Sequence, residues 1–374
     1  MKQGKEWAEG VFEKLKTKLS AECSRLEGII PYIPQDGHYR DIDTGEGIFW
    51  WTNGFWPGLL WQMYHAAGDE GYRKSAEAAE KRLDAALEGF EGLHHDVGFM
   101  WLHSAVANYR LTGNRESRRR GLHAANLLAG RYNPQGKFIR AWNLDRTGWI
   151  IIDCMMNIPL LYWAAKEQAD PRFRMIAQSH ADTALNALVR SDGSCNHIAV
   201  LDPETGVCLE TPGGQGYAAG SSWSRGQSWG LYGFALSFRH TGDRRYLDAA
   251  KRIAHYVTAN LAQNSWLPLV DYRSPPEPVI YDSTAAMIGA CGLLEIAEHC
   301  GEYERNLYAG AALRTLQACE GAFADWDAGR DGVMGKGTGQ YHGGPKDTEV
   351  PIIYGDYFFT EAVLRLLKKD FLIW

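Results

Sequence analysis

The stretch Gly242–Tyr246, which reads Gly-Asp-Arg-Arg-Tyr, is one of five related phrases in the chain. The others begin at Gly68, Gly113, Ala169 and Gly301, so successive phrases start about 45 to 73 residues apart. Each phrase places a Gly or Ala that can end one helix before a residue that opens the next, in most cases a polar residue that can cap it. Recurrence of one theme at this spacing predicts a repeat architecture.

Both sides of each phrase have a helical pattern, but the two sides differ. After Asp243, apolar residues recur three or four positions apart from Tyr246 to Leu261, which predicts an amphipathic helix. The segments before the phrases are apolar nearly all round, as expected of buried helices. These segments are Phe55 to Ala67, Val97 to Leu111, Cys154 to Ala165, Trp229 to His240 and Ala285 to Ala297.

Each repeat therefore pairs a buried inner helix with an amphipathic outer helix. An N-terminal helix from about Glu6 to Leu26 and a C-terminal helix from Asp356 to Lys368 complete six pairs. This alternation predicts an all-α fold, the (α/α)6 barrel of six helical hairpins, with residues 1–374 as a single domain. An open solenoid is the alternative, because the pattern does not by itself require a closed ring.

The long connections all precede inner helices, whereas the turns before outer helices are short. We therefore expect the long connections to gather on one face of the barrel, where a rigid scaffold usually presents its functional site. They cover residues 28–50, 132–149, 190–223, 262–281 and 321–354.

Composition excludes several classes of function. The net charge of −6 gives no basic footprint for nucleic acid. No apolar run reaches the 18 or so residues of a membrane span, and the first residues lack the apolar region of a signal peptide. The seven cysteines contain no C-x-x-C pair, which favours reduced thiols in a cytoplasmic protein. Fourteen tryptophans suggest stacking platforms for a flat-faced ligand.

Each inner helix begins near a polar residue, and capping is the simplest role for such residues. Asp153 is distinctive because it follows three isoleucines, and burial there would raise its pKa toward the range that a general acid needs. Asp96 follows His94 and His95, which can hydrogen-bond to it. A pair of catalytic carboxylates and a set of helix caps both remain open. The six residues are Asn53, Asp96, Asp153, Ser224, Asp282 and Asp356.

A cationic side chain also lies in this region. Arg225, in the first turn of an inner helix, could clamp a carboxylate of a ligand or form a structural ion pair. A required metal is not expected, because His94, His95 and His103 lack the spacing of a zinc site. Residues 325–332 likewise lack the register of a calcium loop.

At these motifs the sequence resembles the unsaturated glucuronyl hydrolases of glycoside hydrolase family 88. The matching stretches follow one another in order over nearly the whole chain. They are Trp51–Trp56, His94–Phe99, Ile150–Cys154 with Asn157–Leu161, Ser224–Ala235 and Tyr354–Tyr357.

The resemblance implies an (α/α)6 barrel that needs no metal or organic cofactor. It also implies a substrate left by a polysaccharide lyase, which carries a 4,5-unsaturated uronic acid at its non-reducing end. The family hydrates the C4=C5 vinyl ether and does not attack the anomeric carbon. By this resemblance Asp153 protonates C4 and assists the addition of water at C5, while Asp96 holds ring hydroxyls and supports the charge on Asp153.

The same resemblance implies a set of substrate-binding residues, among which Trp142 and Trp229 would stack on sugar rings. The set is Trp51, His95, Trp142, His197, Gln215, Arg225, Trp229 and Tyr341. We expect no partner other than the oligosaccharide, neither nucleic acid nor membrane, and a monomer or weak homodimer.

Two departures and three rival functions remain. Asn53 stands where the family often has Asp, and Lys346 lacks the nearby serines of members that prefer sulfated disaccharides. A hydrolase of unsaturated rhamnogalacturonyl disaccharides would have the same fold. A sugar 2-epimerase would use paired histidines, and in a non-catalytic sugar-binding barrel Asp153 would be only a cap.

Overall fold

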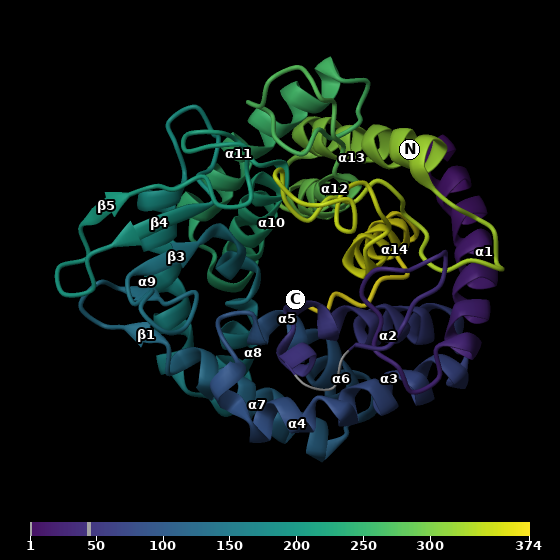
Figure 1. Ribbon diagram of the computed structural model, residues 1–374, viewed down its shortest axis with the longest axis horizontal. Helices are drawn as coiled ribbons and strands as arrows, with labels where there is room; N and C mark the ends of the chain where they lie inside the picture. Colours follow the sequence, from purple (N-terminus) through teal and green to yellow (C-terminus); the bar gives the residue numbers. More distant parts are fainter. Residues whose placement is uncertain (1, 43–45) are drawn as a thin grey trace.

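The computed structural model describes residues 2–42 and 46–374. It shows a ring of six helical hairpins, in which one helix of each hairpin belongs to an inner layer and the other to an outer layer (Figure 1). The inner layer consists of α2 (Phe55–Ala67), α5 (Val97–Trp101) continued by η4 (Leu102–Val106) and α6 (Ala107–Thr112), α8 (Pro159–Gln168), α10 (Ser224–Thr241), α12 (Ser283–Glu298) and α14 (Ile353–Leu367). The outer layer consists of α1 (Lys2–Arg25), α3 (Glu70–Arg82) with α4 (Asp84–Glu88), α7 (Arg115–Ala129), α9 (Pro171–Leu188), α11 (Arg244–Gln263) and α13 (Glu302–Phe323).

Four of the five repeated phrases form the predicted turn. In each, the inner helix ends at a residue with positive φ, and the next side chain accepts a hydrogen bond from the backbone N–H two residues later. The turn pairs are Gly68–Asp69, Gly113–Asn114, Ala169–Asp170 and Gly242–Asp243. The fifth phrase differs, because Gly301 has φ −63° and caps α13 without a side chain.

The ring is closed, so the solenoid alternative is wrong. The last inner helix, α14, packs against both α12 and α2, and the first helix, α1, packs against α14 and α3. The two ends of the chain therefore supply the sixth hairpin, with α1 outside and α14 inside (Figure 1).

Buried charges join this sixth hairpin to the loop 324–334. Lys18 donates to two carbonyls of the loop, at 2.8 and 3.0 Å, and Glu22 accepts from the Gly332 amide at 2.9 Å. Asp356 of α14 accepts from two further amides of the loop, at 2.7 and 3.0 Å. Glu22 and Asp356 have no exposed surface, and this burial raises the pKa of both, that of Asp356 to about 6.

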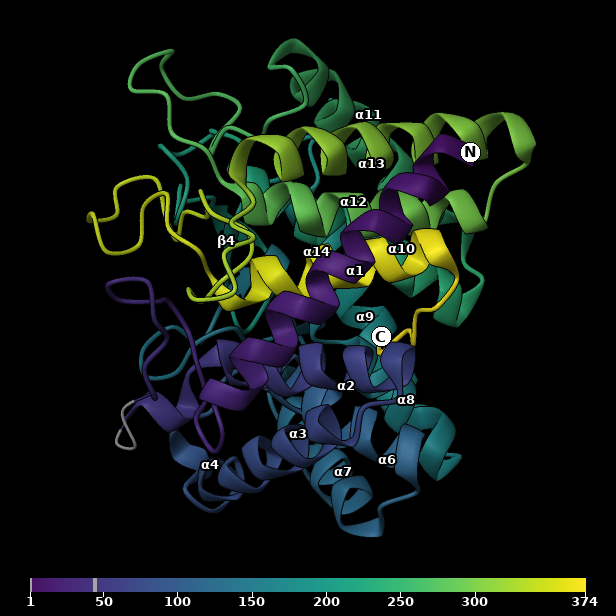
Figure 2. The ribbon, with the colours of Figure 1, turned by 90° about the vertical axis from the view of Figure 1, so that its right-hand side faces the viewer.

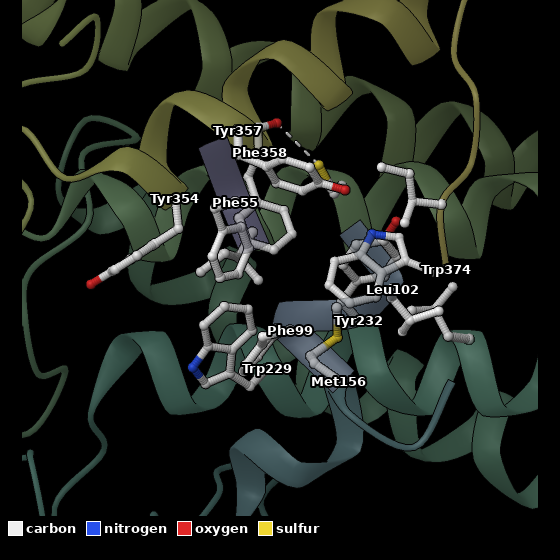
Figure 3. Close-up of a cluster of buried hydrophobic side chains, with 14 of the residues drawn as sticks. Phe55, Phe99, Leu102, Met156, Trp229, Tyr232, Tyr354, Tyr357, Phe358 and Trp374 are labelled. Carbon is white, nitrogen blue, oxygen red and sulfur yellow. Dashed lines mark hydrogen bonds between the residues drawn. The ribbon is translucent and has the colours of Figure 1, made fainter. Parts of the chain in front are cut away.

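Aromatic rings fill the interior of the barrel (Figure 3). The ring of Trp374 stacks on Phe358 at 5.9 Å, and its indole N–H donates to Glu361 at 2.9 Å. Phe99 and Trp229 continue the same packing, with ring centroids 5.1 Å apart. The centre of the barrel is therefore packed, which leaves the ends as the places where a ligand can bind.

The long connections lie at one end of the barrel, as predicted, and occupy the left side of Figure 2. Short helices and strands lie in the connections between the barrel helices. These are η1 (Glu46–Phe49), η2 (Trp51–Gly54), η3 (Phe90–Gly92), β1 (Tyr132–Asn133), β2 (Phe138–Ile139), β3 (Trp149–Ile151), η5 (Ile152–Met156), β4 (Ile198–Leu201) and β5 (Cys208–Glu210). Strands β1 and β2 pair with each other, and β3, β4 and β5 form an antiparallel sheet in that order.

The six polar residues at the starts of the inner helices are mostly not caps. Only Asp282 accepts from an N–H of its own helix, that of Thr284 at 3.1 Å. Asn53 donates to the Gly47 and Ile48 carbonyls, and Ser224 donates to a carbonyl of another loop. Asp96 and Asp153 make no capping bond. Within residues 2–42 and 46–374, no helix is long and apolar enough to cross a membrane.

We expect the unfolding free energy of Glu22→Gln to rise relative to that of the wild type as the pH increases from about 5 to 8. A carboxyl whose pKa is raised by folding stabilises the folded state below its unfolded pKa, and this contribution is lost as the pH rises through the folded pKa. The difference in unfolding free energy between the two proteins should change by up to about 1.4 kcal/mol for each pH unit. Chemical denaturation at several pH values measures it.

The exposed Glu116→Gln variant is the control, and its difference from the wild type should stay flat over the same range. A Glu22→Gln difference that does not vary with pH would contradict the role given to the buried carboxyls.

Candidate active site

Asp96 and Asp153 meet at the loop end of the barrel, on neighbouring inner segments. Each is only 8% exposed. Asn157 joins them, since its amide nitrogen lies 3.1 Å from Asp96 Oδ1 and 3.3 Å from the Asp153 carbonyl oxygen. Its side-chain oxygen accepts from the Phe99 amide at 2.8 Å. Asn157 therefore fixes the start of α5 against η5 and sets the two acids beside each other.

A glycine permits this close approach. A Cβ at Gly98 would lie 2.5 Å from the Asn157 Cα and carbonyl oxygen, which is closer than real contacts allow. The sequence alone does not assign Gly98 or Asn157 to the site. Both lie within the stretches that carry the family resemblance, so the signal was present, but nothing local distinguished a residue that links the acids from one that packs the core.

Two histidine nitrogens lie beside the Asp96 carboxyl group. His94 Nδ1 lies 3.1 Å from Asp96 Oδ2, and His95 Nε2 lies 3.2 Å from Oδ1. Burial raises the pKa of Asp96, but His95, His94 and the Asn157 amide outweigh this effect, so the pKa lies below its ordinary value. Burial also lowers the pKa of His95, and the neighbouring Asp96 charge opposes that shift. The negative charge on Asp96 makes it an acceptor for hydroxyl groups.

The backbone fixes the orientation of the His95 ring. His95 Nδ1 lies 2.8 Å from the carbonyl oxygen of Ala141. A carbonyl can only accept, so Nδ1 carries a proton and Nε2 is the atom presented to Asp96. His95 has no exposed surface, so any effect it has on a ligand is transmitted through Asp96.

Strand pairing places His197 beside Asp153. Strand β3 leads into Asp153 and pairs with β4, which begins directly after His197, and the Ile152 amide donates to the His197 carbonyl at 3.0 Å. His197 Nδ1 accepts from the Gln215 amide at 3.0 Å, so a neutral ring carries its proton on Nε2. That atom lies 3.5 Å from Asp153 Oδ1. This oxygen is buried and makes no closer hydrogen bond within the described chain, which leaves it available for proton transfer.

Arg225 holds the last long loop. It pairs with Asp282 at 2.8 Å and donates to the carbonyls of Thr338 and Gly339, both at 2.5 Å. Gln215 donates to the same Gly339 carbonyl at 2.7 Å and accepts from the Tyr341 amide at 2.9 Å. Arg225 is 1% exposed, so the ion-pair alternative is confirmed and the side chain is not free to clamp a ligand.

The aromatic residues of the predicted set lie at different depths. Trp51 and Trp142 are half-buried, and Tyr341 is 9% exposed. Trp229 has no exposed surface and lies 6.5 Å from Trp51, ring to ring. The prediction that Trp229 stacks on a sugar is therefore wrong for this structure, in which the ring lies in the core beside Phe99 and Phe358 (Figure 3).

A cavity of 920 Å³ opens at the same end of the barrel, beside the segment that carries Trp51. Its lining includes Trp50, which is 42% exposed, and Tyr32, whose ring lies 5.5 Å from that of Trp50. Lys346 lines it as well. The cavity combines aromatic and charged surface, which suits a polar ring-shaped ligand.

One cluster has the donor set for a metal ion. His94, His95 and Asp96 each offer a ligand atom, and these atoms lie within 4.8 Å of one another. In this structure the atoms face one another in the contacts described above, and Asp96 also accepts from Asn157.

Comparisons with known proteins place the chain in a family. Residues 33–264 match the model of Glycosyl Hydrolase Family 88. The chain is 39% identical to the unsaturated glucuronyl hydrolase of Bacillus sp. strain GL1 over 84% of this chain and 86% of the relative. It is 34% identical to the unsaturated chondroitin disaccharide hydrolase of Streptococcus pneumoniae over 91% of this chain and 86% of the relative.

A solved structure supports the same assignment. The crystal structure of the Bacillus sp. GL1 unsaturated glucuronyl hydrolase, described as responsible for the degradation of glycosaminoglycan, aligns with a TM-score of 0.88 at 35% identity. The alignment covers 94% of this chain and 96% of that chain. On sequence, fold and extent together, the chain belongs to glycoside hydrolase family 88.

Proposed function

We propose that this chain is an unsaturated glucuronyl hydrolase, which removes a 4,5-unsaturated uronic acid from the non-reducing end of lyase-generated oligosaccharides. One observation carries the proposal, namely the contrast between two adjoining acids. Asp96 accepts a hydrogen bond from Asn157 and lies 3.1 and 3.2 Å from two histidine nitrogens, and its pKa is lowered, whereas Asp153 Oδ1 is buried, accepts no hydrogen bond and has His197 Nε2 3.5 Å away. Acids in such different surroundings suit different roles in proton transfer.

The reaction begins with proton transfer from Asp153 to C4 of the vinyl ether. Positive charge then develops at C5 and on the ring oxygen, and water adds at C5 while its proton passes to the Asp153 carboxylate. The resulting hemiketal opens to a ketone at C5. The hemiacetal left at C1 releases the remaining sugar, so no bond to the anomeric carbon is attacked directly. Because the anomeric carbon is not attacked, the usual relation between carboxylate separation and stereochemical outcome does not apply.

The neighbouring groups support this sequence. His197 presents Nε2–H to Asp153 Oδ1, which stabilises the carboxylate once its proton has left. Asp96 binds the ring hydroxyls as an acceptor. Trp51 and Trp142 offer exposed aromatic surface to the sugar, while Gln215, Arg225 and Tyr341 shape the site by holding the last loop.

The substrate class follows from the relatives. One is named for unsaturated chondroitin disaccharides, and another is described as degrading glycosaminoglycan. By analogy with these relatives, glycosaminoglycan fragments are the proposed substrates of this chain. Residues 1–374 are proposed to form a single catalytic domain. We also propose a cytoplasmic location, which is supported by seven free thiols, six of them buried.

We expect the wild type to abolish the ultraviolet absorbance of unsaturated disaccharides, because hydration removes the C4=C5 double bond. Asp153→Asn should lower the rate by about a hundredfold to ten-thousandfold, the usual contribution of a general acid. Absorbance followed on fragments of chondroitin, hyaluronan, heparin and gellan measures both rates and ranks the substrates.

The circular dichroism spectrum of Asp153→Asn should match that of the wild type. Unchanged absorbance with wild-type protein on every fragment would sink the proposal. Activity only on unsaturated rhamnogalacturonyl disaccharides would favour that rival. Exchange of a substrate proton with deuterated solvent, with the double bond intact, would favour an epimerase.

We expect Asn157→Ala to lower kcat/KM by about tenfold to a hundredfold, since it removes a hydrogen bond to the charged Asp96. The matched control is Asn260→Ala, which removes an amide that donates to a carbonyl of its own outer helix. The control should retain nearly full activity. Equal effects of the two substitutions on steady-state kinetics would show that Asn157 serves only folding.

A further inference from the structure

Arg131, which follows the outer helix α7, is a half-buried cation without an acid partner. No carboxylate in the described part of the chain pairs with it, and Arg140 lies close enough to act as a like charge. Burial and Arg140 together lower the pKa of Arg131 to about 10, so it stays charged at neutral pH. A buried charge without a counter-ion is unfavourable unless other groups compensate it, which calls for an explanation in terms of what Arg131 contacts.

The guanidinium is compensated by oxygens of four consecutive residues, 140–143. It donates to the Arg140 carbonyl at 2.9 Å, the Ala141 carbonyl at 3.1 Å and the Trp142 carbonyl at 2.9 Å. It also donates to Asn143 Oδ1 at 2.8 Å. One planar group with several fixed donors thus sets the conformation of this entire segment.

The segment held in this way controls two parts of the active site. The Ala141 carbonyl is the acceptor that fixes the proton of His95 on Nδ1, and it also accepts from the His95 amide at 3.2 Å. Trp142 is the half-buried aromatic residue expected to stack on the sugar. A shift of the segment would therefore change both the ring that faces Asp96 and the surface that faces the substrate.

The same contacts tie the segment to the chain just before the catalytic motif. Asn143 Nδ2 donates to the carbonyls of Glu91 and Leu93, at 3.2 and 3.1 Å, and Leu93 directly precedes His94. Arg131 and Asn143 therefore lock the approach to Asp96 against the segment that carries Trp142.

We infer that Arg131 is a positioning residue of the active site, which sets His95 and Trp142 in register with Asp96 through the segment 140–143. The inference rests on the proposed function only because its test measures hydrolase activity. No contact between Arg131 and the substrate is required.

The test compares Arg131→Ala, Arg131→Lys and Arg131→Gln on an unsaturated disaccharide. Each should lower kcat/KM by about tenfold to a hundredfold, as expected for hydrogen bonds made by a charged group. Lysine should not substitute, because a single ammonium cannot reach four fixed acceptors. Guanidinium ion at millimolar concentration should restore part of the activity of Arg131→Ala, while the ammonium ion should not.

The matched control is Arg120→Ala. Arg120 binds Asp84 and Glu80 in the outer layer, so its loss should lower the melting temperature without altering kcat/KM, and guanidinium should have no effect on its activity. A merely structural role for Arg131 would produce this same pattern.

The pH profile gives a second readout. The charged or titratable groups around Asp96 are His94, His95, Asp153, Cys154 and Arg131. Neither lysine nor glutamine can hold the segment that fixes His95, which helps to lower the pKa of Asp96, so the acidic limb of kcat/KM should move to higher pH in both variants and stay in place in Arg120→Ala.

The outcomes separate this inference from the proposed function. An inactive wild type would overturn the function, whereas an active wild type with Arg131→Lys and Arg131→Gln within twofold of it would overturn the inference alone. If Arg131→Ala does not fold, the lysine and glutamine variants still decide the result. A loss of activity in these two variants with an unshifted pH profile, and no guanidinium rescue where Arg131→Ala folds, would also overturn the inference.

Discussion

The pairing of the first and last helices is the constraint on which the structure depends. Each inner helix is apolar nearly all round, so it must be covered by an inner neighbour on each side. For α2 and α12 the missing neighbour is α14, and α14 in turn needs α1 outside it. Lys18, Glu22 and Asp356 complete this arrangement by satisfying the backbone of the loop between α13 and α14. Closure at this point brings the long loops into one circle at one end.

A small number of specific contacts bring the residues of the candidate site together at this end of the barrel. Two inner segments approach because Gly98 has no side chain, and Asn157 spans the gap that remains. The pairing of β3 with β4 brings His197 to Asp153. The two acids then differ in their surroundings, because Asp96 accepts a hydrogen bond from Asn157 and lies beside two histidines, whereas Asp153 has only His197 near its buried oxygen.

Much of the fold could be predicted from sequence, because the patterns that specify the helices and their turns lie close together in the chain. At the turn between α2 and α3, the residue with positive φ, Gly68, directly precedes the capping residue, Asp69. The apolar residues of the outer helices likewise recur within a few helical turns. The residues at the loop end were harder to interpret. Asp153 and Asp356 resemble caps by position, yet neither caps its own helix. Trp229 matches a ligand-binding position of the family but is covered here by Trp51, since exposure depends on which rings pack above it.

The sequence by itself determined the alternation of buried and amphipathic helices, the turns between them, the end at which the loops gather, and the two acids and histidines that carry the family resemblance. These follow from periodicity and from short motifs, which need no knowledge of distant contacts. Only the tertiary structure decided that the ring closes, that Arg225 holds a loop, that Asn157 bonds to Asp96, and that Arg131 binds the same carbonyl as His95. The physical reason is that hydrogen-bond partners and burial are set by residues far apart in the chain, and these meet only when the barrel has formed.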